Sequence, residues 1–155
     1  MTIDDILGVA RSLSGSLVLS PEPGSAYPEL AWGDHFFYYS PDGQVPQRIQ
    51  PYATIVTKNY PGDEESRLDA DGRWRINVQV TRERFAQLVG RPAAAVDFAN
   101  VDLAATDTVL PHPVYARAGL VAVVNPGERT HGLVADLVRE AHRRVMARAN
   151  RGGPT

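Results

Sequence analysis

Polar and apolar side chains alternate strictly along residues 73–80, RWRINVQV. Successive side chains of a β-strand point to opposite faces of the sheet. The segment therefore predicts a strand with one buried apolar face and one polar face. Such a strand is typical of an antiparallel sheet.

Four other segments are rich in β-branched, apolar or aromatic residues and predict further strands: residues 16–19, 30–39, 52–58 and 119–125. The segment 30–39 ends in the turn signal SPDG, and we expect it to pair with residues 16–19 as a hairpin. Residues 91–118 hold three prolines and no sustained period. They are expected to form a long connection of a kind that is often functional.

Apolar residues spaced three or four apart predict three helices. The first covers residues 3–13, where Thr2 and Asp5 resemble a capping box. The second follows the N-cap residue Thr81 and stops at Gly90. The third follows Thr130 and carries one apolar stripe: Leu133, Val134, Leu137, Val138, Ala141 and Val145.

The resulting order is a helix, about four strands, a helix, a strand and a helix. It lacks the alternation of strands and helices that builds a parallel sheet. We therefore predict the α+β class, with a single antiparallel sheet of about five strands and three helices packed mainly on one face. Residues 1–150 are expected to form one domain, followed by a flexible tail at residues 151–155.

Composition narrows the classes of function. The 155 residues include no cysteine, which excludes disulfides, thiolate metal sites and a cysteine nucleophile. The start of the chain lacks the pattern of a secretory signal, and its longest wholly apolar run, residues 120–124, is far too short to cross a bilayer. We expect a soluble cytoplasmic protein with no membrane partner. A net charge of -2 makes nucleic acid an unlikely partner.

Three blocks carry a resemblance to a known family: YATIVTKNYPGDEESRLDADGRWRINVQV, DTVLPHPVYA and AVVNPGERT. In this order they resemble the bacterial domain-of-unknown-function family 6194 over nearly the whole chain. The order of elements is also similar to the MmcQ/YjbR-like fold, some members of which are labelled DNA-binding. Neither resemblance implies a defined reaction.

The polar face of the strand at residues 73–80 is the first candidate for a ligand site. If residues 52–58 pair beside it, Lys58, Arg75 and Asn77 project onto one surface. A guanidinium binds an oxyanion through two hydrogen bonds, and an ammonium adds a point charge. Asn125, at the end of the last strand, is expected to point toward the same site. The alternative is an ordinary solvated sheet face.

The second candidate is the segment DTVLPHPVYA. Its prolines hold Leu110 and His112 in extended conformations. His112 can act there as a general acid or base, with Tyr115 nearby and Asp107 as the group that orients the imidazole. The alternative is a histidine whose ring hydrogen-bonds a backbone carbonyl and so pins the loop.

The loop GDEESRLD lacks the ligand spacing of a calcium loop, and we expect neither a metal nor a cofactor. Asp63 in this loop is expected to cap a turn or a helix.

The leading hypothesis is a domain that binds a small polar or anionic molecule. If the domain is an enzyme, we expect a cofactor-free isomerase, cyclase or lyase of specialised metabolism that uses acid–base chemistry. One alternative is a non-catalytic structural or protein-interaction module. Another is weak nucleic-acid binding through the arginines of the last helix. The oligomeric state stays open.

Overall fold

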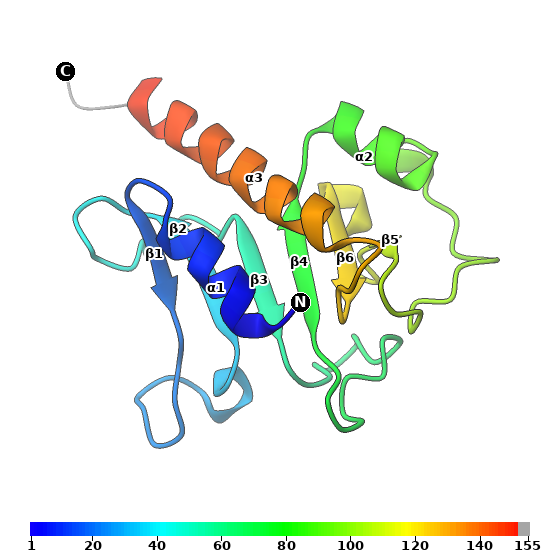
Figure 1. Cartoon of the computed structure of the whole chain (residues 1–155), viewed down its shortest axis with the longest axis horizontal. Coiled ribbons are helices and arrows are strands. Elements are labelled where there is room, and N and C mark those ends of the chain that lie inside the picture. Colours follow the sequence, from blue (N-terminus) through cyan, green and yellow to red (C-terminus); the bar gives the residue numbers. More distant parts are fainter. Residues whose placement is uncertain (152–155) are drawn as a thin grey trace.

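The computed structural model describes residues 1–151, in which three α-helices accompany a six-stranded antiparallel sheet (Figure 1). The helices are α1 (Ile3–Arg11), α2 (Arg82–Val89) and α3 (His131–Arg151). The strands are β1 (Ser16–Leu19), β2 (His35–Tyr39), β3 (Ala53–Val56), β4 (Arg75–Gln79), β5 (Val109–Pro111) and β6 (Leu120–Val124). The predicted α+β class is confirmed, with one strand more than expected.

The strands lie in the order β1-β2-β3-β4-β6-β5, and every neighbouring pair is antiparallel. The predicted hairpin of β1 and β2 is therefore confirmed. The additional strand is β5, which lies in the segment expected to be a connection. It is only three residues long and ends in Pro111, which has no N–H to donate. An edge strand is the position in a sheet that tolerates proline.

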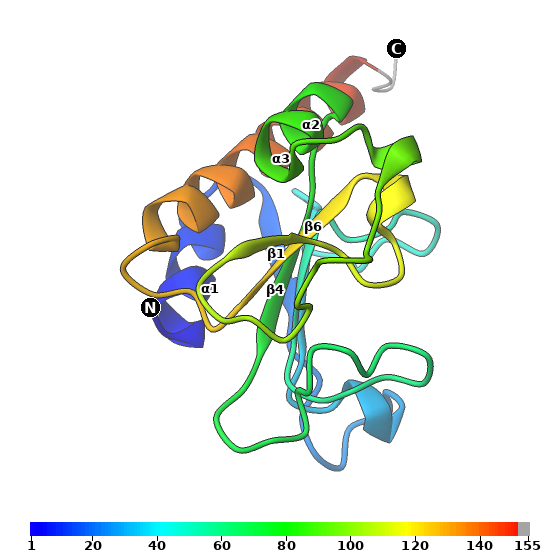
Figure 2. The same ribbon diagram turned by 90° about the vertical axis from the view of Figure 1, so that its right-hand side faces the viewer.

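All three helices contribute to one core on a single face of the sheet, as predicted. Ile76 and Val78 of β4 belong to this core, together with Phe85 of α2. Figure 2 shows α1 and α3 on one side of the strands, while loops and short 3-10 turns lie on the other side. We call this second side, on which neither α1 nor α3 lies, the helix-free face. Arg75 and Asn77 project from β4 onto it, because side chains alternate along a strand.

The helix termini follow the sequence signals. Thr2 and Asp5 form the full capping box of α1, in which each side chain accepts a hydrogen bond from the other residue's backbone N–H. The Thr81 hydroxyl accepts from the Arg84 amide at the start of α2. Gly90 ends α2 with a φ of 87°, a left-handed conformation that favours glycine.

α3 is 21 residues long and continues through Arg151, a residue expected to begin the flexible tail. The rest of the predicted tail, residues 152–155, lies outside the described residues. The buried residues of α3 are His142 and four members of the predicted stripe: Val134, Leu137, Val138 and Ala141. No helix within residues 1–151 combines the length and the apolar character that crossing a membrane requires.

Candidate functional site

A cluster of buried polar side chains lies on the helix-free face around the guanidinium of Arg75. We call it the Arg75 cluster: Asp63, Ser66, Arg75, Asn77 and His112. Arg75 Nη1 and Nη2 donate to Asp63 Oδ1 and Oδ2 at 2.9 and 2.6 Å, a bidentate ion pair. Nε donates to Asn77 Oδ1 at 2.7 Å, and Nη1 also donates to Ser66 Oγ at 3.0 Å. Nη2 lies 3.2 Å from His112 Nε2.

Strand register brings two members of the cluster to the centre of the sheet. Asn77 pairs with Thr54 of β3 and with Ala122 of β6, and Arg75 pairs with Val56 and Val124. The expected pairing of residues 52–58 beside β4 is thus confirmed. The polar face is not solvated, however: Arg75 is 1% exposed and Asn77 3%. The loop between β3 and β4 supplies Asp63 and Ser66 above them.

The imidazole of His112 is held by the backbone that follows it. Its Nδ1 accepts hydrogen bonds from the amides of Val114 and Tyr115, both at 3.0 Å. This is possible because the chain turns back directly after Pro113, while the His112 amide continues the pairing of β5 by donating to the Leu120 carbonyl. The ring therefore fixes the turn by accepting from amides, whereas the sequence suggested a carbonyl partner.

Hydrogen-bond chemistry assigns the proton of this imidazole. A neutral imidazole has one nitrogen that accepts and one that donates. Because Nδ1 accepts from two amides, Nε2 carries the proton. Nε2 then faces Arg75 Nη2, which is also only a donor. The carboxylate oxygen Asp63 Oδ2 is 4.0 Å from Nε2, beyond hydrogen-bonding distance. Two buried donors, Arg75 Nη2 and His112 Nε2, thus point to the same place. The nearest carboxylate oxygen, Asp63 Oδ2, accepts from Arg75 but not from His112.

The charges of the cluster are set by burial and by Arg75. Burial lowers the pKa of His112 to about 4, and the positive charge of Arg75 acts in the same direction against the weaker opposing effect of Asp63. Burial alone would raise the pKa of Asp63, but the hydrogen bonds and charge of Arg75 outweigh it and lower that pKa. At neutral pH the cluster therefore holds a guanidinium, a carboxylate and a neutral imidazole.

The fold is expected to lose stability as the pH falls from 6.5 toward 4. The unfolded chain takes up a proton at His112 near the ordinary pKa of 6.5, whereas the folded chain does so only near 4. The expected loss is about 2–3 kcal/mol in the free energy of unfolding. Urea unfolding at a series of pH values measures it.

Comparison with His112→Asn isolates this contribution, because His35 also has a lowered pKa and remains in both proteins. The variant should show a shallower loss of stability over the same pH range. Equal slopes for the two proteins would contradict the assignment of a neutral buried imidazole.

Lys58 does not join the Arg75 cluster, contrary to its predicted place on one surface with Arg75. Its Nζ donates to the carbonyl of Trp32 at 2.8 Å and to Asp34 Oδ1 at 3.0 Å. Asp34 is fully buried and also accepts from the amide and the hydroxyl of Thr57, at 2.8 and 2.7 Å, and from the hydroxyl of Tyr60. A buried carboxylate without partners is costly. The Lys58 amine therefore lies beside Asp34, the buried carboxylate that needs a positive partner.

One turn connects these two groups of charges. Residues Tyr60 to Asp63 form it, with the Asp63 amide donating to the Tyr60 carbonyl at 2.8 Å and Gly62 at a φ of 78°. The Tyr60 hydroxyl reaches Asp34, and the Asp63 carboxylate reaches Arg75. Pro61 and Gly62, between them, are exposed. The turn thus fastens the loop over the sheet at both of its ends.

Asp107 precedes β5 in the chain, but its carboxylate lies at the start of α3 and does not orient His112. Its carboxylate accepts from the amides of Gly127, Arg129 and Thr130 at 2.8–3.0 Å and from the Thr130 hydroxyl at 2.6 Å. The Thr130 hydrogen bond is the largest of the effects that lower the pKa of Asp107 to about 2. Free amides at a helix start attract a carboxylate from anywhere in the chain. Asp107 therefore acts as a remote cap, and the acid near His112 is Asp63.

Asn125 and Tyr115 are also placed by the fold. Asn125 Nδ2 donates to the Gly72 carbonyl at 2.7 Å, and its Oδ1 accepts from the Trp74 amide at 3.3 Å. These contacts tie the end of β6 to the start of β4, and Asn125 makes them with its backbone at a φ of 45°. The Tyr115 ring lies 5.2 Å from the His112 ring and is 57% exposed. Of the predicted residues, the structure brings together Arg75, Asn77, His112 and Tyr115.

Two surface clefts lie outside the Arg75 cluster. One of about 400 Å³ lies between α2 and the segment 96–111, and one of about 360 Å³ lies between α2 and α3. Neither is lined by a predicted site residue. Within residues 1–151, no three His, Asp or Glu side chains gather in a group that could hold a metal ion.

Comparison with known proteins gives one finding. The model of a family described as "Family of unknown function (DUF6194)" matches residues 1–153. No curated protein and no solved structure matches the chain.

Proposed function

The chain belongs to the DUF6194 family of unknown function, and we propose that it binds a small carboxylate or another oxyanion in the Arg75 cluster. The observation that carries the proposal is the convergence of Arg75 Nη2 and His112 Nε2, two buried donors 3.2 Å apart. An oxyanion that lies beside the pair, within hydrogen-bonding distance of each nitrogen, accepts from both, which Asp63 does not do at 4.0 Å from His112.

Asp63 occupies this position as a carboxylate supplied by the chain itself. It comes from an irregular loop and is the most exposed charged partner in the cluster, with 13% of its side chain accessible against 2% for Arg75. Arg75 and Asn77, by contrast, belong to a central strand. A ligand carboxylate therefore competes with Asp63, and the loop moves while the strand stays in place.

The same geometry favours binding over acid–base catalysis. In the arrangement described, Nδ1 of His112 is occupied by two amides, and Nε2 carries a proton. A general base needs a free nitrogen within reach of the substrate. We therefore propose that His112 donates a hydrogen bond to the ligand, in place of the proton transfer that an isomerase, cyclase or lyase would require.

A non-catalytic structural module is the second candidate. The observation in its favour is the saturation of Arg75, whose guanidinium already donates to Asp63, Ser66 and Asn77. A fully satisfied polar network holds a loop on a sheet without any ligand. This candidate predicts that added anions leave the cluster unchanged.

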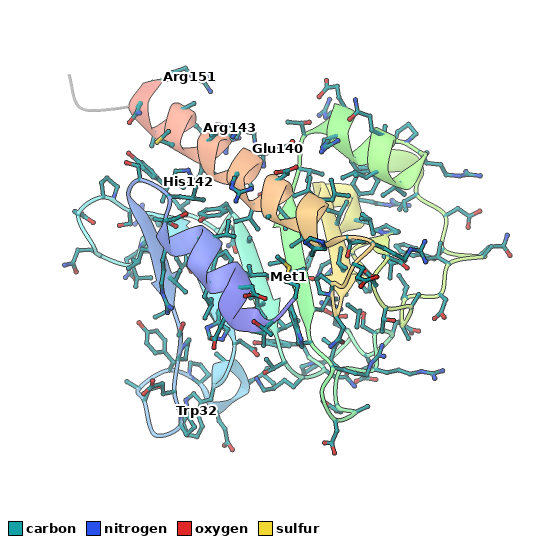
Figure 3. The ribbon with its side chains drawn as sticks, viewed as in Figure 1. Met1, Trp32, Glu140, His142, Arg143 and Arg151 are labelled. Atoms are coloured by element: carbon teal, nitrogen blue, oxygen red, sulfur yellow. The ribbon has the colours of Figure 1, made fainter. Side chains whose placement is uncertain are left out.

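Nucleic-acid binding has weaker support. Arg143 and Arg151 lie along the exposed side of α3 (Figure 3), on the opposite side of the sheet from the Arg75 cluster. Arg139 on the same helix pairs with Asp136 at 3.2 Å, so part of the positive charge is neutralised. We also propose that the protein is cytoplasmic and that its fold is similar to that of MmcQ/YjbR-like proteins.

Replacing Asp63 by asparagine tests oxyanion binding. The variant removes the competing charge and keeps the shape of the side chain, so acetate should bind at least about tenfold more tightly than to the wild type. At saturating acetate, a hundred times its dissociation constant, the variant should gain about 2.7 kcal/mol of stability. Acetate titrations followed by amide NMR shifts and by thermal unfolding measure both quantities.

Asp136→Asn is the matched control, since it removes a carboxylate from an exposed ion pair. It should bind acetate as the wild type does. If Asp63→Asn folds and acetate neither shifts the amides of the cluster nor raises its unfolding temperature, the structural candidate is correct and oxyanion binding is wrong.

A further inference from the structure

The surroundings of the Arg75 cluster are closed in most directions along the helix-free face. Beside Arg75, a small apolar group covers the sheet: Val56, Leu68 and Val124, with Tyr60 packed against it. On the other side of Asn77, Ala122 and Leu110 are 1% and 7% exposed. A ligand larger than acetate therefore cannot extend toward β6 and β5 or over Val56 without displacing packed side chains.

The face is less deeply buried in one direction, toward β2 and β1. Register places four side chains in a row across the sheet: Asn77 opposite Thr54, Thr54 opposite Phe36, and Phe36 opposite Leu19. Thr54, Phe36 and Leu19 are all half-buried, while Asn77 is buried. Asn77 Nδ2 donates to Thr54 Oγ1 at 3.0 Å, so the polar cluster continues directly into this row.

The open end of the row is apolar and aromatic. Tyr38 lies next to Phe36 on the same face, two residues along β2, and is also half-buried. Burial raises the pKa of Tyr38, and the proximity of Tyr27 raises it further. Tyr27 is 42% exposed. We call the surface formed by Leu19, Phe36 and Tyr38 the apolar shelf.

We infer that the ligand of this protein is a monocarboxylate with an apolar, preferably aromatic, body of about 10 Å. The inference rests on the proposed function, because it uses the Arg75 cluster as the carboxylate site. Phe36 is two strands from Asn77, and strands lie about 4.8 Å apart. A carboxylate at Arg75 and His112 thus leaves about 10 Å for a chain that crosses Thr54 and places a ring on the apolar shelf.

Charge and polarity along the row agree with this ligand. The donors lie at one end, with Arg75 as the positive charge, and the other end is the apolar shelf, to which Tyr38 adds a hydroxyl. A dicarboxylate long enough to cross the row would leave its second charge over Phe36 and Tyr38, where no cation of the cluster reaches it. The shelf therefore selects for a single negative charge at one end of the molecule.

Three probes separate the features of the ligand: acetate, 6-phenylhexanoate, whose chain spans the row, and the neutral 6-phenylhexanamide. We expect Asp63→Asn to bind 6-phenylhexanoate about tenfold or more tightly than acetate, because burying the chain and the ring removes apolar surface from water. 6-Phenylhexanamide should bind at least about tenfold more weakly than 6-phenylhexanoate. Of the two carboxylates, only 6-phenylhexanoate should shift the backbone amide signals of residues 17–19 and 36–38.

Phe36→Ser should bring the affinity for 6-phenylhexanoate closer to that for acetate and leave acetate binding unchanged. Ile49→Ser, which removes a 64% exposed apolar side chain from another loop, is the matched control and should keep the preference. The amide shifts of the protein with an intact shelf give the same information if Phe36→Ser does not fold.

Equal affinity for acetate and 6-phenylhexanoate would overturn this inference while leaving oxyanion binding in place. Unchanged 6-phenylhexanoate binding after Arg75→Lys would place that ligand elsewhere, which also overturns it. Absence of binding by all carboxylates would instead refute the proposed function on which the inference rests.

Discussion

Arg75→Met is expected to destabilise the fold by about 3–5 kcal/mol, which is the typical cost of removing one partner of a buried ion pair. The substitution deletes the guanidinium that holds Asp63 through two hydrogen bonds and also serves Ser66 and Asn77. Their oxygens then lose a partner that water does not easily replace, since Ser66 and Asn77 are 1% and 3% exposed. Urea unfolding measures the change.

The control is Arg139→Met, which breaks an exposed ion pair with Asp136 in α3. It should change the free energy of unfolding by no more than about 0.5 kcal/mol. The double variant Arg75→Met with Asp63→Leu should recover part of the loss, because an apolar pair replaces a buried ionic one. A loss below about 1 kcal/mol for Arg75→Met alone would show that the cluster contributes little to the fold.

Asp34→Ala is expected to cost a similar amount, about 3–5 kcal/mol. The Asp34 carboxylate is fully buried and accepts from Thr57, Lys58 and Tyr60. Without it, the Lys58 amine loses its counter-charge, and the turn at residues 60–63 loses one of the two side-chain contacts that hold its ends. Thermal and urea unfolding both report this loss.

A double-mutant cycle separates the contribution of the Tyr60 hydroxyl. Asp34→Ala and Tyr60→Phe should be non-additive by about 1 kcal/mol or more, because their side chains share a buried hydrogen bond. Asp136→Ala, at a carboxylate that is 64% exposed, is the surface control and should have almost no effect. Additive effects of Asp34→Ala and Tyr60→Phe would contradict a direct contribution of this hydrogen bond.

Arg75→Met and Asp34→Ala both weaken the attachment of the loop that lies over the sheet, but they should differ in their effect on ligand binding. Asp34 and Tyr60 hold the end of the turn that does not contact Arg75. Asp63 holds the end that competes with the ligand. Under our proposal, releasing the Asp63 end favours anion binding, whereas Arg75→Met abolishes it.

Local sequence patterns predicted most of the fold because the interactions that define them lie close together in the chain. The alternation in residues 73–80 predicted β4 and assigned Arg75 and Asn77 to one face of it. The caps at Thr2, Thr81 and Gly90 need only the backbone of the next few residues. β5 was missed because three residues with a proline give no periodic signal.

The partners of the charged residues could not be predicted in this way. Asp63 looked like a turn residue, and only the folding of its loop onto the sheet brings it to Arg75, twelve positions along the chain. Asp107 and Lys58 carried signals of chemistry but found other partners. Asp107 caps the start of α3, and Lys58 pairs with the buried carboxylate of Asp34. Burial makes such pairing obligatory, yet it leaves no mark in the local sequence.

The sequence by itself determined the α+β class, the helix boundaries at their caps, the polar side of β4 and the rigid arm around His112. These features depend on steric preferences and on the periods of helix and strand, which act over a few residues. Only the tertiary structure decided that the polar side of β4 is covered and that His112 Nε2 meets Arg75 beneath Asp63. Those contacts join residues 12 to 49 positions apart, and they form because a buried donor or charge must find a partner wherever the fold supplies one.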